Sequence, residues 1–314
     1  MADAIPYRLH LLVSDPWIGT AYGGMELLPA AAHLARLADG AVAHLLVRPS
    51  YHAATILQET VDDVRTIERT TPNLRCTISA NTAEDDVMFR RAGLSSIWCC
   101  HNAFLDERLY APDPTVKKLF DAVHVGRLIP IKRHELANRV RRLAVVTGAW
   151  EVDEAYAMAL ISGFDDLRYI NYRPGQGASV LSQERVRQVM VASRCGLALS
   201  AREGAMYASA EYLLCGLPVV TTPSDGGRDV FFHPDCTLTV PPKPDAVAAG
   251  VAEMVARNLD PQMVRARTLE LFMAHRARLL LWLSGVTQQN LFHHAGDNYW
   301  LPTYSNKLET WRRP

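Results

Sequence analysis

Glycines and basic residues follow three β-rich apolar runs, at positions from which they could bind an anion. Gly126-Arg127 ends the first run, with Lys132 five residues after Arg127, and Ser200–Gly204 (Ser-Ala-Arg-Glu-Gly) ends the second. Gly226-Gly227 follows the third run after a short spacer. A turn between a strand and a helix presents backbone N–H groups that bind phosphate well, and glycine lets the backbone come close to a ligand. Arg and Lys side chains add the positive charge that suits a diphosphate.

Two glutamates accompany these turns. Seven residues separate Glu203 from Glu211, and on one continuous helix the two carboxylates would lie about two turns apart, roughly 12 Å along the axis. That separation is too large for a carboxylate pair attacking one glycosidic bond. It suits two groups that hold the ends of an extended ligand, such as a nucleotide sugar. The alternative is that both glutamates belong to a solvated helix face.

The first third of the chain alternates between β-rich runs and helical periodicity. Strands are expected in four segments, 8–13, 41–47, 76–79 and 97–100, and helices between them in three, 25–37, 53–69 and 82–92. Thr82 has the residue type of a helix cap, and the acidic Glu84 and Asp85 suit a first helical turn. Such alternation predicts a parallel sheet covered by helices on both faces.

A second alternating series begins after a Pro-containing connector at residues 101–117. Its expected strands are 122–125, 143–147, 168–170, 196–199 and 218–221, and its expected helices are 151–160, 182–194 with Ser182 as cap, and 205–215. Two such series predict an α/β protein with two Rossmann-like doubly wound domains facing a central cleft. We place the N-terminal domain at 1–105 and the second at 106–285. A tail at 286–314 is expected to pack back on the first domain.

Composition narrows the class of protein. Lys plus Arg number 33 and Asp plus Glu number 33, so the net charge of zero does not favour a nucleic-acid partner. The six cysteines form no Cys-x-x-Cys pair and predict reduced, buried thiols in a cytoplasmic protein. The start of the chain lacks the features of a signal peptide. The basic run 132–142 predicts a solvated helix face, with a peripheral membrane or acidic-partner contact as the alternative.

The motifs, taken in order, resemble those of the retaining glycosyltransferases of family 4, which have the GT-B fold. The resemblance is good over about residues 100–285 and thin before them. It rests on Gly126-Arg127-Leu128 with Lys132, Ser200–Gly204, Glu211, Gly216–Val220 and Gly226-Gly227. In addition, His101–Asp106 resembles the family's Asn-x-x-Asp hinge with one extra residue, and Tyr22–Glu26 resembles its Gly-Gly-x-Glu loop. Each motif alone is weak, whereas the ordered set is specific.

The resemblance implies a role for each matching position. Arg127 and Lys132 would hold the donor diphosphate and stabilise the leaving nucleotide, and Glu203 would contact hydroxyls of the donor sugar. These three form the implied catalytic set. Glu211 would bind the ribose. Gly23 and Gly24 would border the phosphate or acceptor side. The full set of implied donor-binding residues is Gly126, Gly204, Ala205, Met206, Glu211, Tyr172, Arg173, Gly226 and Gly227.

The implied reaction transfers a sugar from a nucleoside diphosphate sugar to a hydroxyl of a saccharide, lipid-linked or small-molecule acceptor, with retention. The chain has no Asp-x-Asp motif, so we expect neither a metal nor another cofactor. Its N-terminal half is shorter than is usual in the family, and His44, His52 and His101 are candidates for a histidine that touches the donor sugar. Two alternatives remain open: a nucleotide-sugar epimerase or hydrolase-like enzyme, and a non-catalytic nucleotide-sugar-binding subunit.

Overall fold

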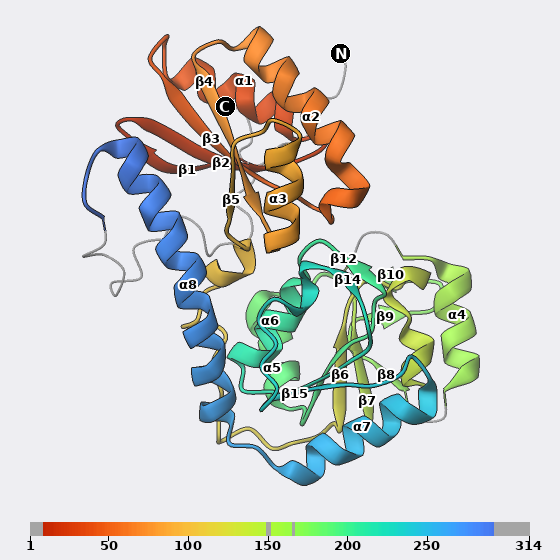
Figure 1. Cartoon of the computed structure of the whole chain (residues 1–314). Coiled ribbons are helices and arrows are strands. Elements are labelled where there is room, and N and C mark those ends of the chain that lie inside the picture. Colours follow the sequence, from red (N-terminus) through yellow and green to blue (C-terminus); the bar gives the residue numbers. More distant parts are fainter. Residues whose placement is uncertain (1–8, 149–151, 165–166, 292–314) are drawn as a thin grey trace. The chain divides into compact units, whose positions relative to one another are not determined.

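The computed structural model describes residues 9–148, 152–164 and 167–291 and consists of two compact units (Figure 1). Unit 1 contains the described residues up to Asp106 together with those from Phe272 onward, and unit 2 is Glu107–Leu271. The boundary at which unit 2 ends therefore falls at Leu271, inside a helix. The sequence had placed the end of the second domain at residue 285. Of the expected tail, only residues 286–291 are described, and the rest lies outside the described residues.

Unit 1 is built on a five-stranded sheet whose strands follow one another in chain order. The strands are β1 (Leu9–Ser14), β2 (Trp17–Tyr22), β3 (Ala43–Arg48), β4 (Leu74–Ala80) and β5 (Ser96–Trp98). The strands from β2 to β5 are parallel, as predicted, whereas β1 pairs antiparallel with β2. The prediction missed β2 because its central residues are buried on both faces, so the run shows no alternation.

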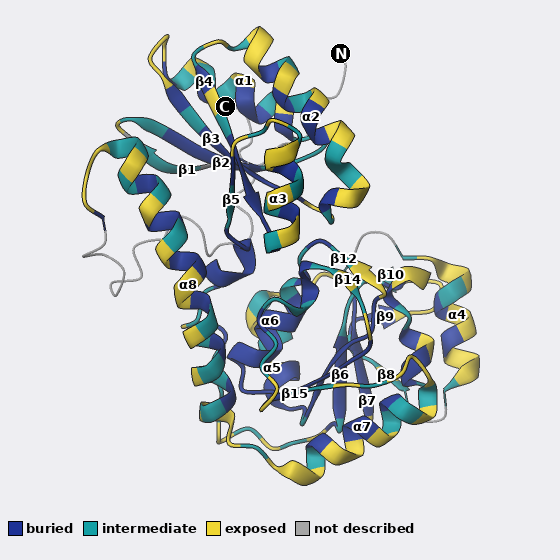
Figure 2. Cartoon of the chain, viewed as in Figure 1, coloured by how far each residue is buried: buried dark blue, intermediate teal, exposed yellow. Residues whose placement is uncertain are grey.

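Three helices cover this sheet and follow the predicted segments. They are α1 (Leu27–Leu37), α2 (Ala53–Thr70) and α3 (Ala83–Arg91). Thr82 caps α3 as predicted, since its hydroxyl accepts a 2.9 Å hydrogen bond from the backbone N–H of Asp85. Parallel strands in chain order place their crossover helices on one face, and α2 packs against both α1 and α3. These three helices therefore lie on one face of the sheet, whereas the sequence predicted helices on both faces. The buried core of unit 1 lies beneath them (Figure 2).

The second half of α8 (Pro261–Thr287) packs against the end of β5 and the 3₁₀ helix η1 (His101–Phe104). The backbone N–H of Cys100 donates to Nδ1 of His275 at 3.0 Å, and Arg276 donates through Nε to the carbonyl of Ala103 at 2.8 Å. The Arg278 guanidinium lies 4.0 Å from the centre of the Trp98 ring. These contacts make the later part of α8 a component of unit 1.

Unit 2 contains a six-stranded, wholly parallel sheet in the order β15-β13-β11-β6-β7-β8. The strands are β6 (Ala122–Val125), β7 (Leu143–Val146), β8 (Leu167–Tyr169), β11 (Gly196–Ala198), β13 (Val219–Thr221) and β15 (Thr237–Thr239). In chain order this is the doubly wound arrangement 6-5-4-1-2-3, which reverses direction between β6 and β11. In such sheets, ligands bind outside the carboxyl ends of the strands at this reversal.

The helices of unit 2 lie on both faces of the sheet, as predicted for a doubly wound domain (Figure 1). They are α4 (Glu154–Gly163), α5 (Gln183–Val191), α6 (Tyr207–Leu214), α7 (Pro244–Arg257) and the start of α8. The cap predicted at Ser182 is confirmed, because its hydroxyl accepts from the backbone N–H of Arg185 at 3.2 Å. None of the helices in the described residues combines the length and apolar character needed to span a membrane.

The basic run 132–142 is not the helix that the sequence predicts. The chain instead forms two short 3₁₀ helices, η2 (Pro130–Lys132) and η3 (His134–Ala137). Arg133 lies between them with a φ of 51°, in the left-handed region, which interrupts a regular helix. Lys132 is also buried, whereas Arg139, Arg141 and Arg142 are exposed.

Candidate functional site

The turns singled out in the sequence meet at the reversal of strand order in unit 2. Gly126 directly follows β6, and Ser200–Gly204 follows β11. Within that second turn, β12 (Arg202–Glu203) pairs in parallel with β14 (Asp225–Gly226), so Glu203 lies opposite Gly226. The backbone N–H of Gly227 donates to the carbonyl of Gly204 at 2.9 Å. Two motifs more than twenty residues apart therefore form one wall of the candidate site.

Lys132 and Glu203 form an ion pair at the centre of this edge. Lys132 comes from η2 and Glu203 from β12, and their side chains are only 11% and 14% exposed. The stem of Lys132 runs beside Gly126, where an added Cβ would lie 3.6 Å from its Cδ. The pair thus presents a cation and a carboxylate at one point that is largely shielded from water. A cation there can bind a phosphate oxygen, and a carboxylate can accept hydrogen bonds from hydroxyls.

Two further arginines, neither of them expected as a site residue, hold the walls of the site. Arg228 is fully buried and donates to the carbonyls of Ser200 and Thr222 and to the Thr221 hydroxyl, thereby joining the turns after β11 and β13. Arg133 donates through Nε to the carbonyl of Leu199 at 2.6 Å and through Nη2 to Thr222 Oγ1 at 2.8 Å. Arg228 could have been identified as a site residue from the sequence, because it directly follows Gly226-Gly227.

A stacked pair of histidines lies behind the ion pair and was also missed. The rings of His124, on β6, and His134, on η3, are 4.1 Å apart at 30°. Burial, together with the charge of the nearby Lys132 ammonium, lowers the pKa of His134 to about 3. Burial, together with the neighbouring His134 ring and the Lys132 ammonium, also holds the pKa of His124 well below its usual value. Both imidazoles are consequently neutral at physiological pH and add no positive charge behind Lys132.

The position of Glu203 relative to Glu211 differs from the sequence expectation. The helix α6 begins at Tyr207, so Glu203 lies on a strand before it, and the predicted separation along one helix is wrong. The residues Gly204, Ala205 and Met206 form the approach to the helix, with Met206 at its cap position. Glu211 lies on α6 and is 2% exposed, so the alternative of a solvated helix face does not hold for this residue.

The neighbouring Tyr212 fixes α6 against the sheet. Its hydroxyl accepts a hydrogen bond of 2.6 Å from the backbone N–H of Val125, the last residue of β6. Its ring lies so close to β11 that a Cβ on Gly196 would be only 2.4 Å from ring atoms, so this strand position requires glycine. Gly226 is required for a different reason, because its φ of 98° is a conformation that other residues rarely adopt.

The proposed base contacts, Tyr172 and Arg173, form the short strand β9, which pairs with β10 (Gly177–Ala178). The Tyr172 side chain is buried in the core of unit 2 and donates its hydroxyl to the Glu154 carboxylate. Arg173 is exposed. This packing favours Arg173 over Tyr172 as a residue that could contact a ligand.

In unit 1, the Gly23-Gly24 turn lies at the carboxyl end of β2, beside that of β3. The backbone N–H of Gly23 donates to the Arg48 carbonyl at 3.0 Å, and the Arg48 guanidinium lies 4.1 Å from the centre of the Tyr22 ring. The His101 ring meets the Tyr22 ring edge-on at 5.9 Å. Burial, with the charge of Arg48, lowers the pKa of His101 to about 3, so its imidazole is neutral.

The other two candidate histidines lie elsewhere in unit 1. His52 precedes α2, and its Nδ1 is 2.7 Å from the Asp85 carboxylate. His44 is the second residue of β3, away from the carboxyl end of that strand. Of the three candidates, His101 is the one whose ring contacts Tyr22, the residue before the Gly23-Gly24 turn.

Comparison with solved structures identifies the fold, whereas no family model and no curated protein sequence matches the chain. HepE from Anabaena, solved with UDP, is 14% identical with a TM-score of 0.59, over 85% of this chain and 78% of HepE. Sucrose-phosphate synthase from Thermosynechococcus elongatus is 14% identical with a TM-score of 0.55, over 86% and 77% of the two chains. A trehalose-6-phosphate synthase is 15% identical with a TM-score of 0.55, over 86% and 73%. The chain has the GT-B fold.

Within this GT-B fold, unit 2 is the Rossmann-like unit that contains a reversal of strand order, and the motif residues surround that reversal. In the part of the chain that the structure describes, no three His, Cys, Asp or Glu side chains are grouped so that they could hold a metal ion. All six cysteines are free thiols, as predicted, and five of them are buried.

Proposed function

We propose that this protein is a retaining glycosyltransferase, similar to family 4, that transfers a sugar from a nucleoside diphosphate sugar to a hydroxyl acceptor. The observation that carries the proposal is the shielded Lys132–Glu203 pair at the reversal of the unit 2 sheet. The neighbours support it, because HepE was solved with UDP and glucose, and the trehalose-6-phosphate synthase was studied for glycosyl transfer with retention.

Each chemical group of the nucleotide sugar has a matching part of the site. Arg127 and Lys132 would bind the diphosphate, together with backbone N–H groups of Gly204–Met206 before α6. Glu203 would accept hydrogen bonds from sugar hydroxyls, and Glu211 would do so from the ribose. The Gly226-Gly227 turn would let the backbone approach the donor closely. Arg173 is the remaining candidate for the nucleobase end.

In the proposed reaction, the acceptor hydroxyl attacks the anomeric carbon on the face from which the diphosphate departs. The bond from that carbon to the diphosphate oxygen breaks, a bond to the acceptor oxygen forms, and the departing phosphate takes the acceptor proton. Negative charge then develops on the diphosphate, where Arg127 and Lys132 stabilise it. The remaining contribution of the protein is to hold donor and acceptor in position.

We assign the acceptor to the side of the Gly23-Gly24 turn, with His101 beside it as the residue that would touch the donor sugar. The acceptor would be a saccharide, a lipid-linked molecule or a small molecule, and the exposed arginines of the run 132–142 would permit a peripheral membrane contact. We place the reaction in the cytoplasm, because six free thiols suit a reducing compartment.

Substitution of the two glutamates separates their proposed roles. Glu211→Gln should weaken binding of both the nucleotide sugar and the bare nucleoside diphosphate about ten- to 150-fold, because both ligands carry the ribose. Glu203→Gln should leave nucleoside diphosphate binding nearly unchanged while lowering transfer, because only the donor carries the sugar. Calorimetry with each ligand, alongside initial rates, measures both effects on variants with wild-type melting temperatures.

Equal loss of nucleoside diphosphate binding in the two variants would contradict these assignments. The donor is first chosen by screening UDP-, GDP- and ADP-sugars for thermal stabilisation, since a ligand that binds the native state raises the melting temperature. Donor binding without transfer to any acceptor would indicate a non-catalytic subunit instead. Hydrolysis or epimerisation of the donor without an acceptor would indicate a nucleotide-sugar epimerase or hydrolase-like enzyme.

We also propose that transfer requires no metal, because the chain lacks Asp-x-Asp and the cations Arg127 and Lys132 can neutralise the diphosphate. The initial rate in excess EDTA should therefore stay within about twofold of the untreated rate. Activity that disappears with EDTA and returns with Mn²⁺ or Mg²⁺ would refute this proposal while leaving the transfer reaction itself in place.

A further inference from the structure

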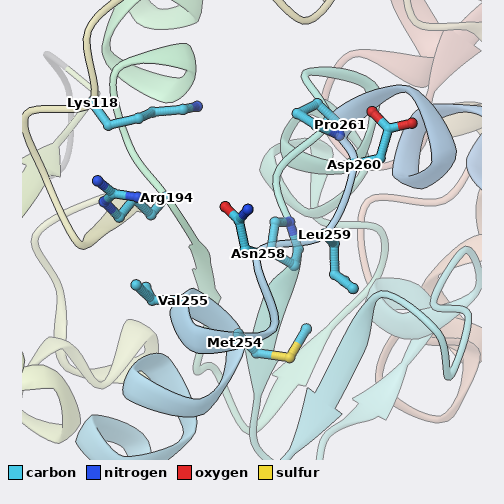
Figure 3. A pocket seen from close by; sticks show the side chains of 10 residues that line it. Lys118, Arg194, Met254, Val255, Asn258, Leu259, Asp260 and Pro261 are labelled. Carbon is cyan, nitrogen blue, oxygen red and sulfur yellow. The ribbon is translucent and has the colours of Figure 1, made fainter.

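A cavity of about 350 Å³ lies in unit 2, at the end of the sheet opposite the candidate donor site (Figure 3). Arg194 lines it and precedes β11, and Pro218 lines it and precedes β13. The donor-site turns follow the same two strands at their carboxyl ends. The cavity is therefore a separate location in the same unit, and its volume lies in the range of small-molecule sites.

Two cations line this cavity. The Lys118 ammonium donates to the carbonyls of Val191 and Ser193 at 2.8 and 2.9 Å, next to the end of α5. An ammonium group has three donors, so one remains for a ligand. Burial lowers the pKa of Lys118, and the charge of nearby Arg194 lowers it further. Two positively charged side chains therefore line the same cavity.

Among the residues that the structure describes, Arg194 has no acidic partner. Its guanidinium makes no hydrogen bond or ion pair with any of the residues that the structure describes. One acidic residue lines the cavity, Asp260, and its carboxylate accepts from the backbone N–H of Gln262 at 3.0 Å near the start of α8. The charges of the lining residues therefore favour an anion.

The rest of the lining suits the neutral part of a small molecule. Figure 3 shows the Asn258 amide between Arg194 and Pro261, with Met254 and Leu259 nearby. Asn258 ends α7 in the left-handed conformation with a φ of 46°. Its amide can both donate and accept hydrogen bonds, whereas the Met254 and Leu259 side chains offer apolar contact.

We propose that this cavity binds a small molecule through an oxyanion group, a phosphate or a carboxylate, held by Arg194 and Lys118. The planar guanidinium of Arg194 matches two oxygens of either group. The neutral part of the ligand packs beside Asn258, Met254 and Leu259. This site is independent of the proposed donor site, since it shares no residue with it.

Calorimetry on the full-length protein tests the proposal with three probes: inorganic phosphate, glucose 6-phosphate and citrate. We expect at least one to bind the wild type and to bind Arg194→Gln at least tenfold more weakly. Arg194→Lys, which keeps the charge without the planar fork, should bind with intermediate affinity. Arg257→Gln is the matched control, because it removes a charge next to Asn258 from a side chain that pairs with Glu253 outside the cavity.

The probe that binds distinguishes the two oxyanions, because only citrate carries carboxylates. The proposal is overturned if no probe binds the wild type, if both Arg194 variants bind like the wild type, or if Arg257→Gln weakens binding as much as Arg194→Gln does. Nucleoside diphosphate binding should be the same in wild type and Arg194→Gln. A failure of the donor-site assignment therefore leaves this test unaffected. Likewise, a failure of this test leaves the donor-site assignment unaffected.

Discussion

Replacing Lys132 with Met should lower the rate of sugar transfer about hundred- to thousandfold, the range seen when one preorganised donor to a developing anion is removed. The side chain is mostly buried and its ammonium pairs with Glu203, so the charge acts away from bulk water, where it is least screened. Initial rates at saturating donor, measured on variants with wild-type melting temperatures, test this result.

A neighbouring basic residue supplies the control. Arg139 belongs to the same basic run but is exposed, so Arg139→Met should transfer at the wild-type rate. Lys132→Met combined with Glu203→Gln should lose less than the product of the two single losses, because each single change leaves a poorly solvated charge without its partner. Activity of Lys132→Met within threefold of wild type would remove Lys132 from the catalytic set.

Acidification should destabilise both units well before their carboxylates protonate. The pKa values of His101 and His134 lie at about 3 and that of His275 at about 4, in each case mainly because burial disfavours the imidazolium. Below the unfolded value near 6.5, the unfolded chain binds protons that the folded chain does not, so the free energy of unfolding falls as pH falls. The loss begins near pH 6.5 and continues to about pH 3 or 4.

The expected size of this effect is large. Between pH 7 and pH 5, each of these three histidines lowers the free energy of unfolding by about 2 kcal/mol, or about 6 kcal/mol together. His124, whose pKa is also lowered, acts in the same direction. A total of this size is comparable to the whole stability of many domains. Urea unfolding at several pH values, with proton uptake measured by calorimetry, gives the slope of the free energy of unfolding against pH directly.

One substitution assigns part of that slope. His134→Phe keeps a flat ring against His124 but cannot bind a proton, so the proton uptake on unfolding of unit 2 should fall by up to one at pH 5. His233→Gln, which changes a partly exposed histidine of the same unit, is the control for the substitution. A free energy of unfolding that stays flat between pH 7 and pH 5 would show that the buried histidines are not the neutral groups described above.

The sequence by itself determined the motif positions of the candidate donor site. Gly126, Glu203 and Gly226 each follow a short apolar run, and these runs form β6, β11 and β13 as expected. Because the carboxyl ends of parallel strands share one edge of a sheet, local periodicity was enough to predict that these residues come together. The caps at Thr82 and Ser182 were predictable for the same reason, since each depends on bonds within a single turn.

Only the tertiary structure decided which side chains touch. Lys132 meets Glu203, and Arg228 joins the turns after β11 and β13, because the sheet places β11 next to both β6 and β13. Strand order, and the burial that makes His124 and His134 neutral, depend on contacts between residues distant in sequence. Local residue patterns do not encode those contacts, so the sequence assigned Lys132 to the diphosphate but did not predict its pairing with Glu203 or the 3₁₀ turn that buries it.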